Sequence, residues 1–303
     1  MANTHRKRPR SRASTPTTAP INVTEPSEPP HKTKKLKLHA SYTLQSPFPD
    51  FTRPSPEEAQ EVFNILSKAH SPDGVHRLEP SSSSDNSAES CGNVPDVIEA
   101  LIGTILSQNT SAKNSSAAKA NLDAKFGRNN FAAIADASRE EVVDAIRNGG
   151  LANKKAGTIQ NILRSVKEKH GVYSLQHLAS SSMENEEIMR ELMSYDGVGP
   201  KTASCVLLFC LGRDSFAVDT HVYRLSRLLG WVPGKADKVL AQAHLDLRIP
   251  DELKYGLHVL MIQHGRVCKG CRKSASGNCV LKIYVGQRVD QGSSLRDGEG
   301  EYK

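Results

Sequence analysis

Apolar residues from position 95 onward recur mostly at the spacing of an α-helix. The clearest run follows Pro95, a residue that suits the first turn of a helix. Its members lie at i, i+3, i+4, i+7 and i+8, and they are Ile98, Leu101, Ile102, Ile105 and Leu106. This spacing predicts a helix that buries one face in a core.

Similar patterns predict helices along most of the remaining chain. Ser138 and Glu141 have the spacing of a capping box, and Gly149-Gly150 would end the helix that they begin. One helix is expected at 56–70, and others at 117–126, 156–169, 186–195, 201–211, 221–229 and 253–264. Alternating, β-branched runs are scarce, so we predict an all-α fold of one or two packed helical lobes.

Two stretches lack this periodicity. Residues 1–46 are rich in Pro, Ser, Thr, Lys and Arg, and residues 80–94 include a run of serines. Such segments cannot bury enough apolar surface to offset the entropy of ordering, so we expect a disordered tail and a low-complexity insertion. With a flexible C-terminal tail expected over 286–303, the folded domain is expected at 47–285.

The positive charge of the chain is concentrated at its N-terminus. Residues 1–40 hold nine of the 40 Lys and Arg residues but only two of the 33 acidic residues, so the net charge of +7 arises there. The basic clusters at 6–12 and 32–37 have the composition of a nuclear-import signal or a nucleic-acid-binding arm. We expect a nuclear protein, with a merely solvated charged tail as the alternative.

The remaining composition bounds the class of protein. No run of about 18 apolar residues occurs, and no apolar signal-peptide core follows Met1, so we expect neither membrane spanning nor secretion. Six cysteines without a secretory signal favour reduced thiols or metal ligands over a disulfide framework.

Residues 196–202, with the sequence DGVGPKT, lie between two predicted helices. Gly197 and Gly199 permit positive φ in a tight turn, and Pro200 fits the entry of the next helix. Amide groups at such a helix N-terminus lie beside the positive end of the helix dipole and can hold a phosphate. An ordinary turn between helices is the competing interpretation.

Residues 191–224, ELMSYDGVGPKTASCVLLFCLGRDSFAVDTHVYR, resemble the helix-hairpin-helix and catalytic segment of the endonuclease III-like (HhH-GPD) DNA glycosylases. Further similar segments follow the family's order: LIGTILSQNT at 101–110, GLANKKA at 150–156 and LHVLMIQHGR at 257–266. The resemblance covers 95–282. It implies a helix-hairpin-helix motif at the cleft of a two-lobed DNA repair enzyme.

The resemblance implies two catalytic residues. Lys201 matches the lysine that attacks C1′ of an everted nucleotide and forms a Schiff base; a contact to phosphate is the alternative role. Asp219 matches the aspartate that stabilises the developing positive charge on the sugar. An Asp before Thr and a helical run is also a good N-cap, so a structural role competes.

The resemblance also implies DNA-binding residues. Either Gln108 or Asn109 would fill the gap left by the everted base, and a polar C-cap of the preceding helix is the competing explanation. The remaining candidates belong to the hairpin or to other matched segments, and they are Gly197, Val198, Gly199, Thr202, His221 and Lys155. For His221 and Lys155, packing inside the protein is the alternative role.

The cysteine pattern departs from the family. Many relatives carry four cysteines spaced Cys-x6-Cys-x2-Cys-x5-Cys that bind a [4Fe–4S] cluster, whereas this chain has Cys268, Cys271 and Cys279. His264 could serve as a fourth ligand for zinc, but its spacing does not favour that. We therefore expect a degenerate site without a cluster and no cofactor, with the three cysteines as weak metal candidates. Cys205 and Cys210 are expected to be buried core thiols.

The function that the resemblance implies is a bifunctional DNA glycosylase and AP lyase of base-excision repair. Its partner would be double-stranded DNA with a damaged or mismatched base, most simply an oxidised pyrimidine, and we expect it to act as a monomer. The alternatives are a glycosylase for another base (a T or U mismatch, a 5-methylcytosine derivative or 8-oxoguanine) and a non-catalytic helix-hairpin-helix DNA-binding protein.

Overall fold

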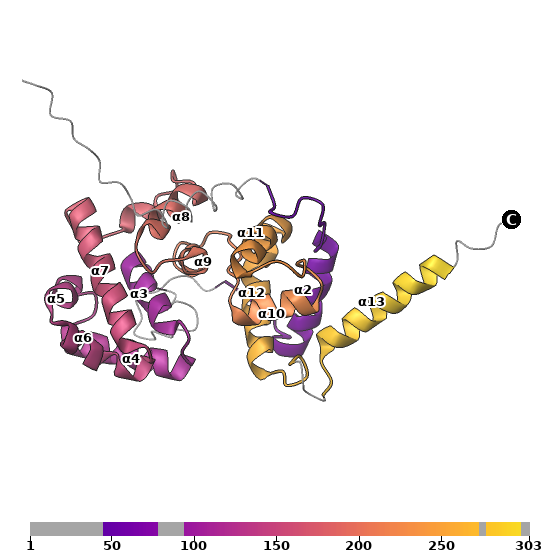
Figure 1. The fold of residues 1–303 in the computed structure, drawn as a ribbon, viewed down its shortest axis with the longest axis horizontal. Helices are drawn as coiled ribbons and strands as arrows, with labels where there is room; N and C mark the ends of the chain where they lie inside the picture. Colours follow the sequence, from indigo (N-terminus) through magenta and orange to yellow (C-terminus); the bar gives the residue numbers. More distant parts are fainter. Residues whose placement is uncertain (1–44, 78–93, 273–276, 298–303) are drawn as a thin grey trace, which may run out of the picture.

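The computed structural model describes residues 45–77, 94–272 and 277–297. Within these ranges the regular structure is helical and contains no strand, which confirms the predicted all-α class (Figure 1). Nearly all of the expected tail at 1–46 and of the expected insertion at 80–94 lies outside the described residues. None of the described helices has the length and apolar character needed to span a membrane.

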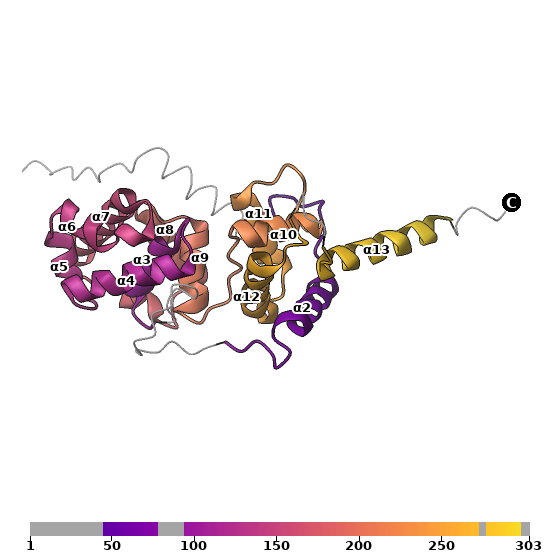
Figure 2. The same cartoon turned by 90° about the horizontal axis from the view of Figure 1, so that it is seen from below.

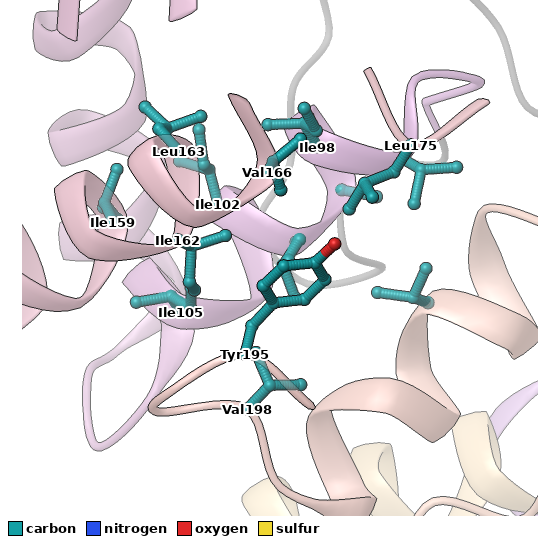
Figure 3. Close-up of a cluster of buried hydrophobic side chains, with 14 of the residues drawn as sticks. Ile98, Ile102, Ile105, Ile159, Ile162, Leu163, Val166, Leu175, Tyr195 and Val198 are labelled. Atoms are coloured by element: carbon teal, nitrogen blue, oxygen red, sulfur yellow. The ribbon is translucent and has the colours of Figure 1, made fainter. Parts of the chain in front are cut away.

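The first lobe is built from consecutive helices of the middle of the chain (Figure 1). They are α3 (Val97–Ser107), α4 (Ala112–Phe126), α5 (Phe131–Asp136), α6 (Arg139–Ala145), the 3-10 turn η2 (Arg147–Gly149), α7 (Ala152–His170), the 3-10 turn η3 (Gln176–Ala179), α8 (Asn185–Ser194) and α9 (Pro200–Phe209). Figure 3 shows the core of this lobe, where isoleucines of α3 and α7 lie in one cluster with Tyr195 and Val198 of the α8–α9 turn.

The second lobe joins the two ends of the described chain. Helix α2 (Pro56–His70) packs against α12 (Asp251–Val267) and α13 (Val280–Asp297), and α10 (Thr220–Leu228) and α11 (Lys238–Arg248) complete the lobe. Its core is separate from that of the first lobe and contains the fully buried Trp231. From residue 45 onward the described chain thus begins in the second lobe, builds the first and returns, as the two views in Figures 1 and 2 show.

Helix α9 connects the lobes. Nine of its ten residues are buried, and Lys201 is the exception. Several of its side chains belong to the first core, while Leu208 and Phe209 pack against Tyr255 of α12 in a small cluster between the lobes. Because α9 is covered on all sides by protein, a shift of this helix would disturb both lobes.

The predicted caps form where the sequence places them, with one difference. Ser138 and Glu141 make the reciprocal bonds of a capping box at α6, as expected. Asp96, rather than Pro95, bounds α3: its side chain accepts the Glu99 amide, so the helix starts at Val97 and Pro95 precedes the cap. The helix expected at 117–126 begins earlier, at Ala112, because Ser111 caps it.

Three helices were not predicted: α5, α11 and α13. Helix α5 has only six residues and follows an Asn cap, so it is too short for periodicity to mark it. Helix α13 continues to Asp297 and so extends into the region 286–303, for which the flexible tail stays a prediction. Its first turns are held to α2 through Tyr284, whose hydroxyl donates to Glu61 at 2.7 Å.

Candidate active site

A cleft of about 420 Å³ lies where residues of both lobes meet. It is lined by Lys201 of α9, by Asp219, the N-cap of α10, and by His221 of α10. The residues that complete its wall include Asn109, Thr110 and Ser111 of the α3–α4 loop, together with His258, Ile262 and Arg266 of α12. The structure therefore brings together Lys201 and Asp219, the two residues that the sequence singled out for catalysis.

Lys201 owes its position to the α8–α9 turn. Gly197 has a φ of +86°, and a Cβ there would lie 2.4 Å from the Thr158 side chain of α7, so the turn requires glycine. Val198 is buried in the core of the first lobe and anchors the turn to that core. Gly199 differs from the expectation of positive φ: its φ is −109°, in the extended region, and it is the N-cap of α9. Lys201 is therefore held in the first turn of α9.

Asp219 also lines the cleft. It is the N-cap of α10, and its Oδ1 accepts the Val222 amide at 2.7 Å. The cap uses one of the two carboxylate oxygens, so the capping role and a role in the cleft are compatible. Among the residues that line the cleft, Asp219 supplies the one carboxylate.

His258 also lines the cleft, although the sequence pattern gave it no role of its own. Its side chain is 1% exposed, and Nδ1 lies 2.8 Å from the Ala217 carbonyl, to which it donates. Burial lowers the pKa of His258, with the charge of Lys201 acting in the same direction and that of Asp219 opposing it. The imidazole is thus neutral at pH 7 and adds no second cation beside Lys201. The sequence alone could not show that His258 lines the cleft, because a His on a largely apolar helix face is usually a core residue. Its place in the cleft is evident only from the folded structure.

Three helix N-termini converge on the cleft. Ser111 and Ala112 begin α4, Lys201 lies in the first turn of α9, and Thr220 begins α10. Each N-terminus carries a partial positive charge and amide groups without partners inside the helix. Together with Lys201 and Arg266, they make the cleft electropositive and suited to a polyanion such as the DNA backbone.

The two candidates for the base gap occupy different places. Gln108 is the C-cap of α3, and its amide donates to Thr202 Oγ1 at 3.3 Å. Asn109 is exposed, has a φ of +51° and lines the cleft. Gln108 and the buried Thr202 therefore tie α3 to α9, and Asn109 is the residue that the cleft presents to a ligand.

Lys155, expected on the DNA side, points into the first lobe. Its side chain is 3% exposed, and its ammonium donates to the Leu106 carbonyl, the Gly149 carbonyl and Thr110 Oγ1, each at 2.7 Å. Burial lowers the pKa of Lys155 to about 8, so it remains charged at pH 7. With its donors engaged inside the lobe, Lys155 positions the α3–α4 loop rather than meeting phosphate.

One further residue lines the cleft, and another lies near the α3–α4 loop. His221 lines it and packs against Gly265 of α12, where an added Cβ would lie 2.7 Å from His221 Cβ. Leu151, which the sequence analysis did not single out, is 56% exposed and has a left-handed backbone with a φ of +50°. It follows Gly150, whose Cβ position faces the Thr110 hydroxyl, so Leu151 lies next to the α3–α4 loop.

The C-terminal cysteines form a cluster that the spacing alone did not suggest. His264, Cys268 and Cys271 offer donor atoms within 4.8 Å of one another. Three cysteines do not meet the four-thiolate requirement of a [4Fe–4S] cluster, and no step below depends on one. The absence of any metal nonetheless stays a prediction, because this donor group could hold an ion. Cys205 and Cys210 are buried, as expected, and Cys205 also reaches the cleft.

Comparison with known proteins identifies the family. Residues 102–250 match the sequence model described as "HhH-GPD superfamily base excision DNA repair protein". A protein of Arabidopsis thaliana named "Putative DNA glycosylase" is 37% identical over 246 residues, which cover 76% of this chain and 83% of that protein. Endonuclease III of Sulfolobus acidocaldarius is 29% identical over 200 residues, covering 66% of this chain and 86% of the relative.

The fold has a counterpart among solved structures. A trapped covalent intermediate of endonuclease III with DNA superposes with a TM-score of 0.58 at 23% identity, covering 78% of this chain and 99% of the other. This similarity confirms the fold that the sequence resemblance implies.

Replacing Lys155 by methionine removes an ammonium from three acceptors and leaves two buried carbonyls without that donor. Each unsatisfied group costs about 1–3 kcal/mol, so we expect the free energy of unfolding to fall by about 2 kcal/mol or more. Urea unfolding followed by circular dichroism measures the change. Lys154→Met, at the exposed neighbouring position, is the matched control and should stay within about 0.5 kcal/mol of wild type. Equal effects of the two substitutions would contradict the positioning role.

Proposed function

We propose that this chain, which belongs to the HhH-GPD superfamily of base excision DNA repair proteins, is a bifunctional DNA glycosylase and AP lyase. The observation that carries the proposal is the presence of Lys201 and Asp219 on the wall of one cleft, at the N-termini of two helices. A hydrolytic glycosylase needs the carboxylate but has no need of an amine at this place. A covalent intermediate of endonuclease III with DNA has been trapped, which is in keeping with a covalent mechanism.

In this mechanism, the Lys201 amine attacks C1′ of an everted nucleotide while the bond from C1′ to the base breaks. The base leaves with the bonding electrons, and the sugar ring opens to give an imine between Lys201 Nζ and C1′. Loss of a C2′ proton then expels the 3′ phosphate by β-elimination, and hydrolysis of the imine returns the amine. The positive end of the α9 dipole beside Lys201 disfavours its ammonium form and so favours the nucleophile.

Asp219 complements this step electrostatically. Its carboxylate is fixed by the Val222 amide and lies in a cleft whose other charges are positive. A preoriented anion stabilises the positive charge that develops on the sugar as the base leaves, and it can accept the proton that Lys201 loses.

Base eversion is assigned to the α3–α4 loop. Asn109 lines the cleft and is exposed, so its amide can enter the space that the everted base vacates. Filling that space offsets part of the unstacking cost of a few kcal/mol. Lesions and mismatches, which are cheaper to unstack, are therefore favoured over normal base pairs. Within that class we propose an oxidised pyrimidine as the substrate, the choice that the resemblance to endonuclease III implies.

Lys201→Ala removes the proposed nucleophile. We expect cleavage of abasic DNA to fall by on the order of 10³-fold or more, and the borohydride-trapped protein–DNA adduct to disappear. The adduct is measured by its shift on a denaturing gel. Lys68→Ala, at an exposed lysine in the last turn of α2 on the second lobe, is the control and should keep both signals. An adduct of equal yield from Lys201→Ala would remove the lyase proposal and leave a DNA-binding role.

Asp219→Asn separates the two roles of that residue. Asn caps a helix about as well as Asp, so the melting temperature should stay close to wild type. Base release should fall by about 10²-fold, because the amide cannot balance the charge on the sugar. Single-turnover excision and a thermal melt on the same preparation give both values. Near-normal excision would reduce Asp219 to a cap.

The proposed substrate class is tested with a panel of duplexes that carry thymine glycol, 8-oxoguanine, uracil, a T:G mismatch or 5-methylcytosine. We expect the thymine glycol duplex to be cleaved fastest. Faster cleavage of any other member would assign that base instead, while leaving the lyase chemistry intact.

A further inference from the structure

Four metal-binding side chains meet at the C-terminal end of α12, away from the catalytic cleft. His264 lies in the last turn of that helix, Cys268 is its C-cap, and Cys271 follows. The donor atoms of these three lie within 4.8 Å of one another. Cys279, at the start of α13, adds a fourth: its Sγ lies 3.5 Å from His264 Nε2. His264, Cys271 and Cys279 are each at most 5% exposed.

The backbone holds the two cysteine segments together. A Cβ on Gly270 would lie 2.6 Å from the Gly277 carbonyl oxygen and 3.0 Å from that of Asn278. Only glycine permits this approach, because the contacting atoms belong to the backbone and cannot rotate away as the end of a side chain could. The segments of Cys271 and Cys279 are thus in direct contact on either side of residues 273–276, which lie outside the described residues.

Side chains from other helices complete the arrangement. His70 Nε2 of α2 lies 2.8 Å from His264 Nδ1. With His264 Nδ1–H donating to His70, the Nε2 lone pair of His264 is the one that faces Cys279. Arg224 of α10 donates to Cys271 Sγ at 3.0 Å and to the Cys271 carbonyl at 2.8 Å. A hydrogen-bonded imidazole and a cation beside a thiolate are the surroundings that metal ligands have in proteins.

We propose that His264, Cys268, Cys271 and Cys279 bind a single zinc ion. For Zn–S of about 2.3 Å and Zn–N of about 2.0–2.1 Å, a tetrahedral site has an N···S edge of about 3.6 Å and an S···S edge of about 3.8 Å. The 3.5 Å between His264 Nε2 and Cys279 Sγ matches the first edge. Three thiolates around a divalent ion leave one negative charge, which the Arg224 guanidinium balances.

The same distances argue against an iron–sulfur cluster at this place. Each ligand of a [4Fe–4S] cluster binds a different iron, so its ligand atoms stand much farther apart than ligands that share one ion. The donor atoms of His264, Cys268 and Cys271 lie within 4.8 Å of one another, and Cys279 Sγ lies 3.5 Å from His264 Nε2, so these spacings suit one ion. The cluster that the family resemblance implies is thus replaced here by a smaller site made from a different donor set.

The site would support one wall of the catalytic cleft. Arg224 also donates to the Gly265 carbonyl at 3.0 Å, and Gly265 packs against His221, which lines the cleft. Zinc would fix the start of α13 to the end of α12, and through Arg224 it would fix the α10–α12 contact. Its role is therefore structural, and the proposal does not depend on the substrate or on the lyase step.

The test starts with the full chain, purified without a metal-affinity step and analysed for zinc, iron and sulfide. We expect about one zinc per chain and a colourless protein. Chelation should lower the melting temperature by about 5 °C or more, and added Zn²⁺ should restore it. Co²⁺ added to the chelated chain should give the visible absorption of a tetrahedral thiolate site. Stoichiometric iron and sulfide, or no metal and no response to chelation, would overturn the proposal.

Variants locate the ion. Cys279→Ser and His264→Ala should each abolish stoichiometric zinc, whereas His264→Cys, which supplies a fourth thiolate, should retain it. Cys210→Ala, at a buried thiol of the first lobe, is the control and should keep full zinc content. Unchanged zinc in Cys279→Ser would exclude the fourth ligand and overturn the site. Should the ligand variants fail to fold, the cobalt spectrum of the wild-type chain decides, because it reports thiolate ligation directly.

Discussion

The burial of α9 between the two lobes is the constraint on which the site depends. Every residue of this helix except Lys201 is buried, partly in the core of the first lobe and partly against α12. A helix packed on all sides cannot rotate, so its one uncovered position is fixed in space. The tight turn at Gly197, pressed against Thr158, sets where α9 starts. Packing at a distance from the chemistry therefore determines where the Lys201 amine lies.

Electrostatics follow from the same arrangement. The N-termini of α4, α9 and α10 reach the cleft because their helices are anchored in different parts of the two lobes. Their dipoles attract the DNA backbone and, in the proposed mechanism, disfavour the ammonium form of Lys201. The buried, neutral His258 adds no further positive charge to the cleft. Asp219 supplies the opposing charge. Affinity for the polyanion and the proposed activation of Lys201 thus arise from one set of helix ends.

Much of this could be predicted from the sequence, and what could not has physical reasons. Apolar periodicity and caps located most helices, and the resemblance located Lys201 and Asp219, because both signals are local. The inward direction of Lys155 was missed, since it depends on the carbonyls of Leu106 and Gly149 elsewhere in the first lobe. The choice between Gln108 and Asn109 required the position of Thr202. The sequence spacing does not favour His264 as a ligand together with the cysteines, because its proximity to Cys279 and His70 arises only in the folded structure.

The central claim is that the Lys201 amine becomes bonded to the sugar of an everted nucleotide. Its most direct test is to reduce the complex of wild-type chain and abasic DNA with borohydride, digest both polymers, and map the modified peptide by mass spectrometry. We expect a deoxyribose remnant on the side chain of Lys201. A remnant on any other lysine, or on the N-terminal amine, would contradict it.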